Sequence, residues 1–348
     1  MSHDQGRICA ICGAPEPHVE IATVHQAALH GNSHRLQELI NDGADISTTE
    51  TGREFTPLHF AVQSGNEAVV KSLIEASANA SSPTCDGVTP LHNAAAQGAV
   101  AVTKLLLEVG ADVDARNVDE ETPLHVVSLF GGSQVARLLV DAGADVSAKD
   151  CYGNSPLHIA AAHELMDIVQ LLLDAGADLN AVNNNGDSVL HHAMFDGPAS
   201  IRLLLEKGAD TSITGQFGDS LLHRAAKSSE EFVQLLLNTG ADIEAVADDG
   251  ATPFHRAAAY GSTEIIKLLL DRGANAKATT TNGETALHLV AGIPDAPYLG
   301  EKPGSDEKAR LLIDAGVDIN ARTTSGKPAL ARAKECRRHA VERILSTL

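Results

Sequence analysis

The stretch DGVTPLHNAAAQGAVAVTKLLLEVGADV, at residues 86–113, decides the fold of this chain. Thr89 before Pro90 is typical of a helix that starts with a capping hydroxyl and has proline at its first position. Three alanines leave room for a second helix to approach closely, and the leucines at 105–107 supply the buried stripe of that helix. Gly110 can then adopt the left-handed conformation that ends the helix. The stretch therefore predicts two short helices packed against each other.

The same pattern returns along almost the whole chain. The first four complete copies of its Thr-Pro-Leu-His box begin 33 residues apart. Self-similarity at such a period is typical of a solenoid, in which each unit buries its apolar face only by stacking on its neighbours. The box, or a close variant, begins at Thr56, Thr89, Thr122, Ser155, Ser188, Ser220, Thr252 and Thr285, with an eroded first copy from Ala22 and a last copy from Pro328.

These residues resemble the ankyrin repeat family over residues 22–345. The resemblance implies an all-α solenoid of helix-turn-helix units with projecting β-turn fingers. We expect residues 1–18 to be an N-terminal segment, disordered or capping, and residues 19–348 to form the repeat array. The expected repeats are 19–48, 53–82, 86–115, 119–148, 152–181, 185–213, 217–245, 249–278, 282–321 and a C-terminal cap at 325–348.

The ninth repeat carries an insertion of ten residues, within the stretch 292–308, which has three prolines and three glycines. This composition predicts a surface loop. The loop is either a recruitment site or an insertion that the fold tolerates.

The composition of the chain limits both its core and its partners. Aromatic residues make up only 3% of it and Trp is absent, which favours many thin layers over one deep core. The net charge of −20 argues against nucleic-acid binding, because contact with phosphates requires Lys and Arg. It favours basic partners, although a generally solvated acidic surface explains it more simply.

The segment 322–348 has the opposite charge, with seven Lys or Arg against two Glu. Cations near the end of the last helix would favour its dipole, and a docking site for an acidic partner or a membrane surface is the alternative. The five cysteines are mostly far apart, which predicts reduced thiols in the cytoplasm or nucleus. We expect no signal peptide and no integral membrane segment, because no apolar stretch has the required length.

Nine of the sixteen histidines occupy the same position of the repeat. In the family that this chain resembles, the imidazole at this position hydrogen-bonds within and between neighbouring repeats. Rings on neighbouring repeats, about one helix diameter (~10 Å) apart, are too distant to share a metal. We therefore expect a structural role for His25, His59, His92, His125, His158, His191, His223, His255 and His288.

Cys9 and Cys12 form a Cys-x-x-Cys-Gly turn that looks like half of a zinc ribbon, with His18 as a nearby donor. The sequence lacks the second Cys pair that a closed tetrahedral site requires, so two free thiols in a frayed segment are the simpler interpretation. If zinc binds, it should cap the open end of the array.

Nothing else in the sequence supports catalysis. The tetrapeptide at 218–221 spells the signature of a lipase and esterase group, but Ser220 takes the place of the helix-capping Thr of the repeat. The sequence has no phosphate-binding Gly-rich loop, no His-Glu-x-x-His and no dinucleotide fingerprint. We therefore predict no catalytic residue, no cofactor and no enzymatic activity.

In the ankyrin family the partner usually lies on the concave face, where it touches the finger tips and the exposed side of each first helix. Six of the ten Phe and Tyr fall in those positions. Exposed aromatic side chains are typical binding anchors. Packing on the adjoining repeat is the alternative for Phe130, Phe195 and Tyr260. The candidate protein-binding residues are Phe55, Phe130, Tyr152, His163, Phe195, Phe217, Asp219, Asp248, Asp249 and Tyr260.

The leading hypothesis is a non-catalytic protein–protein interaction module, such as an adaptor, scaffold or inhibitor, that acts as a monomer. The expected partner is a basic segment with apolar side chains, lying along repeats four to eight. The alternatives are a substrate-recruiting subunit of a modifying enzyme, a secreted effector acting on host proteins, and a zinc-dependent module at the N-terminus.

Overall fold

The computed structural model describes residues 19–50, 52–195, 197–292 and 305–347, with side chains from Val24 onward. The predicted N-terminal segment 1–18 and most of the predicted insertion at 292–308 lie outside the described residues. The chain divides into two compact units, Met1–Asn183 and Asn184–Leu348. Each unit has its own helices and its own buried core.

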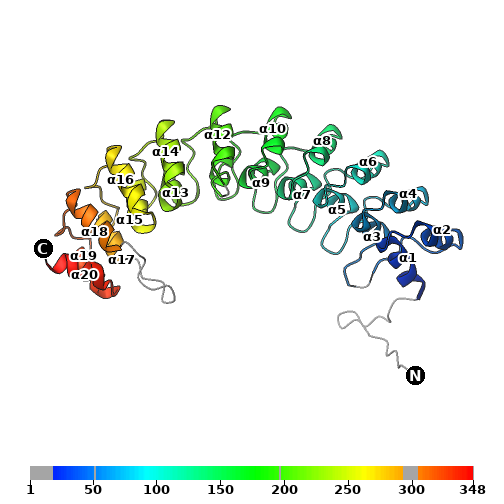
Figure 1. The fold of residues 1–348 in the computed structure, drawn as a ribbon, viewed down its shortest axis with the longest axis horizontal. Coiled ribbons are helices and arrows are strands. Elements are labelled where there is room, and N and C mark those ends of the chain that lie inside the picture. The colour runs from blue at the N-terminus through cyan, green and yellow to red at the C-terminus, as the bar shows by residue number, and fades with distance from the viewer. Residues whose placement is uncertain (1–18, 51, 196, 293–304, 348) are drawn as a thin grey trace, which may run out of the picture. The chain divides into compact units, whose positions relative to one another are not determined.

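The first unit consists of helix pairs that pack side by side (Figure 1). The odd-numbered helices contact one another along the unit and so do the even-numbered helices, which gives two layers. The helices are α1 (Val19–Leu29), α2 (Ser33–Asn41), α3 (Pro57–Ser64), α4 (Glu67–Glu75), α5 (Pro90–Ala96), α6 (Val100–Glu108), α7 (Pro123–Phe130), α8 (Ser133–Asp141), α9 (Pro156–Ala162) and α10 (Met166–Asp174).

The second unit has the same alternation of first and second helices. The regular structure of the described residues is helical in both units, which confirms the predicted all-α class. The elements of this unit are α11 (Val189–His192), α12 (Pro198–Glu206), the 3-10 turn η1 (Gln216–Gly218), α13 (Leu221–Ser228), α14 (Glu230–Asn238), α15 (Pro253–Tyr260), α16 (Thr263–Asp271), α17 (Ala286–Gly292), α18 (Ser305–Asp314), α19 (Ala329–Glu335) and α20 (His339–Ser346).

The insertion in the ninth repeat is shorter at its C-terminal end than the sequence predicts. Helix α18 already begins at Ser305, so residues up to Lys308 form its first turn. Asp306 and Glu307 lie in that turn, where negative charge favours the helix dipole. Part of the polar stretch that indicates a loop in the sequence, residues 305–308, therefore forms the first turn of a helix.

The stretch 86–113 folds as its pattern predicts. Pro90 opens α5, and Leu91, Ala94 and Ala95 of that helix are fully buried. Leu106 of α6 is also fully buried. Small residues on the first helix let the leucine of the second helix pack closely, and each such layer removes apolar surface from water.

Most of the buried histidines that the sequence singles out link neighbouring repeats. The backbone N–H of Thr89 donates to His92 Nδ1 at 3.1 Å, so the ring proton resides on Nε2. Nε2 then donates to the Glu121 carbonyl oxygen of the next repeat at 3.0 Å. Equivalent bonds to the following repeat are made by His25, His59 and His125 in the first unit and by His223 and His288 in the second.

Backbone hydrogen bonds also join successive fingers, the turns that precede each first helix. In the first unit, the N–H of Val118 donates to the Asp86 carbonyl at 2.9 Å, and that of Cys151 donates to the Asp119 carbonyl at 2.9 Å. In the second unit, the N–H of Asp248 donates to the Phe217 carbonyl at 3.0 Å. These bonds hold the finger tips in a row, so side chains at the tips are presented from a fixed backbone.

Glu120 occupies a finger position where neighbouring repeats have glycine. Its φ is +60°, in the left-handed region, whereas Gly87 and Gly153 take the same position with φ of +73° and +79°. We expect Glu120→Gly to raise the free energy of unfolding by about 0.5–1 kcal/mol, because glycine adopts this conformation without steric cost. Urea denaturation would measure the change, with Glu120→Ala as the control that removes the carboxylate but keeps the strain. An equal gain in stability from both variants would contradict the prediction.

Candidate functional site

Five of the predicted anchor side chains are at least half exposed. In the first unit, Phe130 at the end of α7 is 65% exposed and Tyr152 on a finger is 66% exposed. In the second unit, Phe195, Phe217 and Tyr260 are 70%, 69% and 50% exposed. Packing within the unit therefore leaves most of Phe130 and Phe195, and half of Tyr260, open to a partner.

Phe55 differs from these five anchors. Its ring lies 5.5 Å from the ring of His59 and 5.6 Å from that of Phe60, centroid to centroid, and it is only partly exposed. Its carbonyl oxygen also accepts a hydrogen bond from the imidazole of His25. The ring of Phe55 thus packs within its own repeat, and its backbone joins that repeat to the first one.

Phe217 stands between two cavities of the second unit. One, of about 520 Å³, is lined by residues that include Met194, Phe195 and Arg224. The other, of about 570 Å³, is lined by residues that include Asp248, Arg256 and Tyr260. Three residues line both cavities: Phe217, Asp219 and Lys227. We call the surface formed by the two cavities together the Phe217 groove.

The backbone at Phe217 is unusual for its residue type. Its φ is +62°, a left-handed conformation that a bulky side chain rarely adopts, and the following Gly218 has φ of +70°. A Cβ on Gly218 would approach Asp248 Oδ1 to 2.5 Å, so only glycine fits there. Strain of this kind costs about 1–3 kcal/mol and concentrates at functional positions. The finger thus maintains a costly conformation that holds an aromatic ring in solvent.

Ion pairs between repeats lie along the same groove. Arg224 contacts Asp187 at 2.5 Å, and Arg256 contacts Asp219 at 2.9 Å. Glu284 and Arg332 form the corresponding pair further along. Sequence reasoning missed this ladder, although its pattern is readable: an acid directly precedes the capping residue of one box, and an arginine follows the box histidine, or its equivalent, in the next copy.

Asp219 is the most heavily engaged carboxylate of the groove. It is 5% exposed, and its oxygens accept hydrogen bonds from Lys227 at 2.6 Å and from both Nε and Nη2 of Arg256. Burial acts to raise the pKa of Asp219, but the hydrogen bonds from Lys227 and Arg256 outweigh it and hold the pKa below its usual value. Asp219 therefore holds the side chains of Lys227 and Arg256 in place in the groove.

The remaining predicted site residues are placed as follows. Asp249 is paired with Arg256 through two hydrogen bonds, at 2.8 and 3.1 Å. Asp248 is exposed, and its carboxylate accepts no hydrogen bond from the residues that the structure describes. His163 is exposed at the C-terminal cap of α9 in the first unit. Cys9, Cys12 and His18 lie outside the described residues, and the described part of the chain holds no group of three potential metal-binding side chains.

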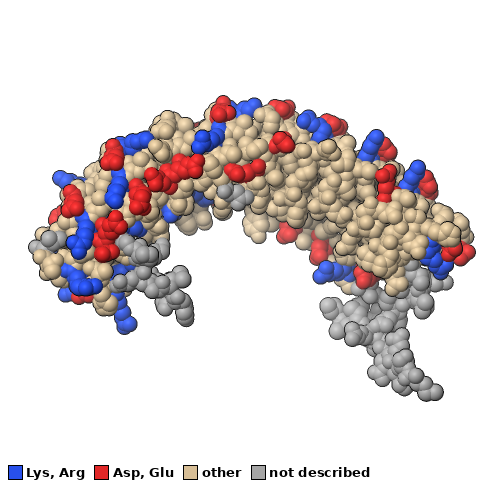
Figure 2. Space-filling view, in the orientation of Figure 1, with Lys and Arg blue, Asp and Glu red and all other residues tan. Residues whose placement is uncertain are grey.

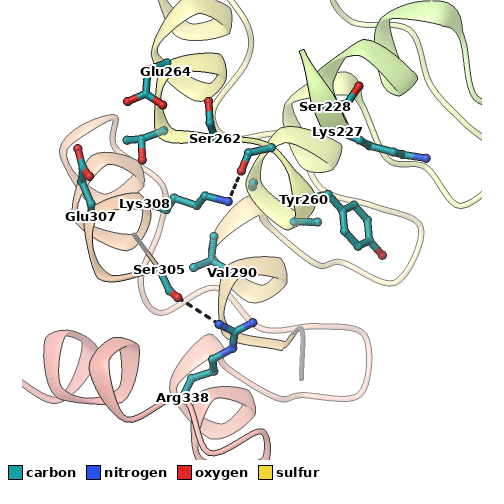
Figure 3. Close-up of a pocket in the computed structure, with 14 residues that line it drawn as sticks. Lys227, Ser228, Tyr260, Ser262, Glu264, Val290, Ser305, Glu307, Lys308 and Arg338 are labelled. Atoms are coloured by element: carbon teal, nitrogen blue, oxygen red, sulfur yellow. Dashed lines mark hydrogen bonds between the residues drawn. The ribbon is translucent and has the colours of Figure 1, made fainter. Parts of the chain in front are cut away.

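Another cavity of the second unit, of about 560 Å³, lies where α15 and α16 meet α18 (Figure 3). Lys308 of α18 donates a hydrogen bond from Nζ to the Gly261 carbonyl oxygen between α15 and α16. Arg338, which caps α20 and is 4% exposed, donates to Ser305 Oγ at 3.1 Å (Figure 3). Lys308 and Arg338 thus connect the start of α18 to the neighbouring helices. The polar groups of this cavity therefore have a structural role.

Many of the acidic residues serve the fold itself. After the glycine that ends a second helix, Asp112 accepts a hydrogen bond from the backbone N–H of Asp114 at 3.1 Å, which closes a local turn. On α6, Lys104 pairs with Glu108 across one helical turn, and Figure 2 shows such neighbouring charges along the second helices of the first unit. The same turn as at Asp112 is made by Asp45, Asp145, Asp178, Asp210, Asp242 and Asp318.

Paired helices joined by hydrogen-bonded fingers, with histidines bonded across successive units, define an all-α repeat solenoid. The family model for ankyrin repeats (3 copies) matches residues 24–117, 112–183, 166–247 and 222–323. The chain belongs to the ankyrin repeat family. Ankyrin repeats generally mediate protein–protein interactions. No described helix combines the length and the apolar character needed to cross a membrane.

Proposed function

We propose that this protein is a non-catalytic interaction module, an adaptor, scaffold or inhibitor, that binds a partner polypeptide through its fingers and first helices. The observation that carries the proposal is Phe217: an exposed ring, held by a strained finger, between two cavities. Exposed aromatic side chains beside a pocket are typical of binding hot spots. Phe130 and Tyr152 give the first unit anchors of the same kind.

The proposed partner is a segment with basic and apolar side chains. The exposed acids of the fingers favour basic residues, and the aromatic rings favour apolar ones. We further propose that the protein acts as a monomer in the cytoplasm or nucleus. Cys85 and Cys336 are free thiols, which supports a reducing compartment.

Replacing Phe130, Tyr152 and Phe217 together by Ala should weaken binding by more than about 2 kcal/mol, because each truncated aromatic anchor costs about 1 kcal/mol or more. The partner would be captured on the wild-type chain, and its affinity measured by isothermal titration calorimetry. Val100 and Val109, which are partly exposed on and after α6, provide the control when replaced by Ala. Unchanged affinity of the triple variant would defeat the proposal.

A further inference from the structure

The cavity between Phe217 and Tyr260 contains one carboxylate to which no described residue donates a hydrogen bond. Three acids line this cavity, but Asp219 is bonded to Lys227 and Arg256, and Asp249 is bonded to Arg256. Asp248 alone among them accepts no hydrogen bond from a described residue. The two cations of the cavity are therefore already neutralised, and the charge left for a ligand is the negative charge of Asp248.

The backbone of Asp248 is held beside the Phe217 finger. Its backbone N–H donates to the Phe217 carbonyl at 3.0 Å, so the two fingers are joined at this residue. Its Oδ1 lies over Gly218, where a Cβ would come within 2.5 Å of it. A carboxylate and two exposed rings thus border one cavity on a backbone that hydrogen bonds hold together.

We propose that this cavity binds an arginine side chain of the partner segment, with its guanidinium paired to Asp248 and stacked against Phe217 and Tyr260. The proposal rests on the proposed function, because it names the chemistry of the segment bound there. A guanidinium is planar, stays charged, stacks on aromatic rings and forms two parallel bonds to a carboxylate. An ammonium group is more strongly hydrated and makes none of the planar contacts, so lysine is expected to bind less well.

The other cavity of the Phe217 groove sets the second requirement on the partner. Met194 and Phe195 line it together with Phe217, and its Arg224 is paired with Asp187. An apolar side chain therefore fits this cavity. The two cavities lie on successive repeats, about 10 Å apart for helices in contact. An extended segment advances about 10 Å in three residues, so the apolar residue and the arginine should be about three residues apart.

The first experiment selects ligands without assuming a partner. A phage-displayed library of random twelve-residue peptides would be panned on the full chain and, in parallel, on Asp248→Asn and Asp271→Asn. Asp271 is an exposed acid at the end of α16, so its variant has the same charge as Asp248→Asn but an unchanged cavity. We expect peptides selected on the wild type and on Asp271→Asn to share an arginine near an apolar residue. Peptides selected on Asp248→Asn should lack this arginine.

The second experiment measures the coupling between the two charged groups. For a selected peptide, Arg→Gln should weaken binding to the wild type about tenfold or more, and binding to Asp248→Asn by less than about threefold. Arg→Lys should fall between these values. Equal losses on both proteins, or an arginine preference that persists on Asp248→Asn, would overturn the arginine site.

The outcome also separates this inference from the proposed function. Peptides that lose binding on Phe217→Ala but carry no preferred arginine would support a binding groove and overturn the arginine site. Failure to select any peptide whose binding depends on Phe217 would overturn the groove itself, and the arginine site with it. Thermal unfolding of each variant, followed by circular dichroism, verifies that the exposed substitutions leave the fold intact.

Discussion

Lowering the pH from about 7 to about 5 should reduce the free energy of unfolding by about 4 kcal/mol through two buried histidines alone. In the second unit the pKa of His191 and of His255 is lowered to about 4, mainly by burial and in smaller part by the nearby guanidinium of Arg224 or Arg256. The unfolded chain keeps a histidine pKa near 6.5, so it binds more protons than the folded chain in this interval. Stability is therefore full above about pH 6.5 and falls until about pH 4, by close to 2 kcal/mol per histidine at pH 5.

Urea denaturation at several pH values, followed by circular dichroism, would measure this loss. His255→Gln should lower stability at neutral pH but reduce the pH-dependent loss by about 2 kcal/mol, because one titrating group is gone. His34, whose side chain is 88% exposed, is the control, since His34→Gln should leave the pH dependence unchanged. A flat profile between pH 7 and 5 would contradict the prediction, because it would mean that the folded chain takes up as many protons as the unfolded chain in this interval.

Much of this fold can be predicted from sequence because its decisive interactions are local. Thr89, Pro90 and Gly110 set the ends of their helices through contacts within a few residues, and the structure places the helices accordingly. The exposed rings were also predictable, since the repeat fixes which positions face solvent. The exposure of the Phe217 ring follows from its finger position alone, whereas the left-handed backbone conformation of this residue does not.

Side-chain pairing across repeats is harder to predict. Asp219 occupies a finger position and was therefore expected to face a partner, yet it is buried against Arg256, which lies 37 residues further along the chain. Phe55 was expected to be a free anchor, but it packs on Phe60 of its own repeat. The regular positions of the acid and the arginine are visible in the sequence. Whether two such side chains meet, and how Phe55 packs, depends on the rotation of one repeat against another and on rotamers, which periodicity does not give.

Arg256→Ala should lower the free energy of unfolding by about 3 kcal/mol, because it leaves the buried Asp219 with Lys227 as its only cation. Chemical denaturation of the full chain would measure the loss. The matched control is Arg202→Ala. Arg202 also bridges to another helix pair, contacting Glu231 at 3.0 Å, but both side chains are more than half exposed. Removing that pair should cost no more than about 0.5 kcal/mol, since water screens exposed charges.

A double variant tests what the buried pair is for. At the next junction of the second unit, the positions equivalent to Asp219 and Arg256 are held by Ala251 and Leu289. Asp219→Ala with Arg256→Leu should therefore regain most of the stability lost in Arg256→Ala, because well-packed apolar residues often replace a buried ion pair at little cost. Stability equal to the wild type, together with weaker partner binding, would mean that the pair is retained to hold Lys227 and Asp249 in the Phe217 groove. A double variant as unstable as Arg256→Ala would show instead that the charges themselves stabilise this junction.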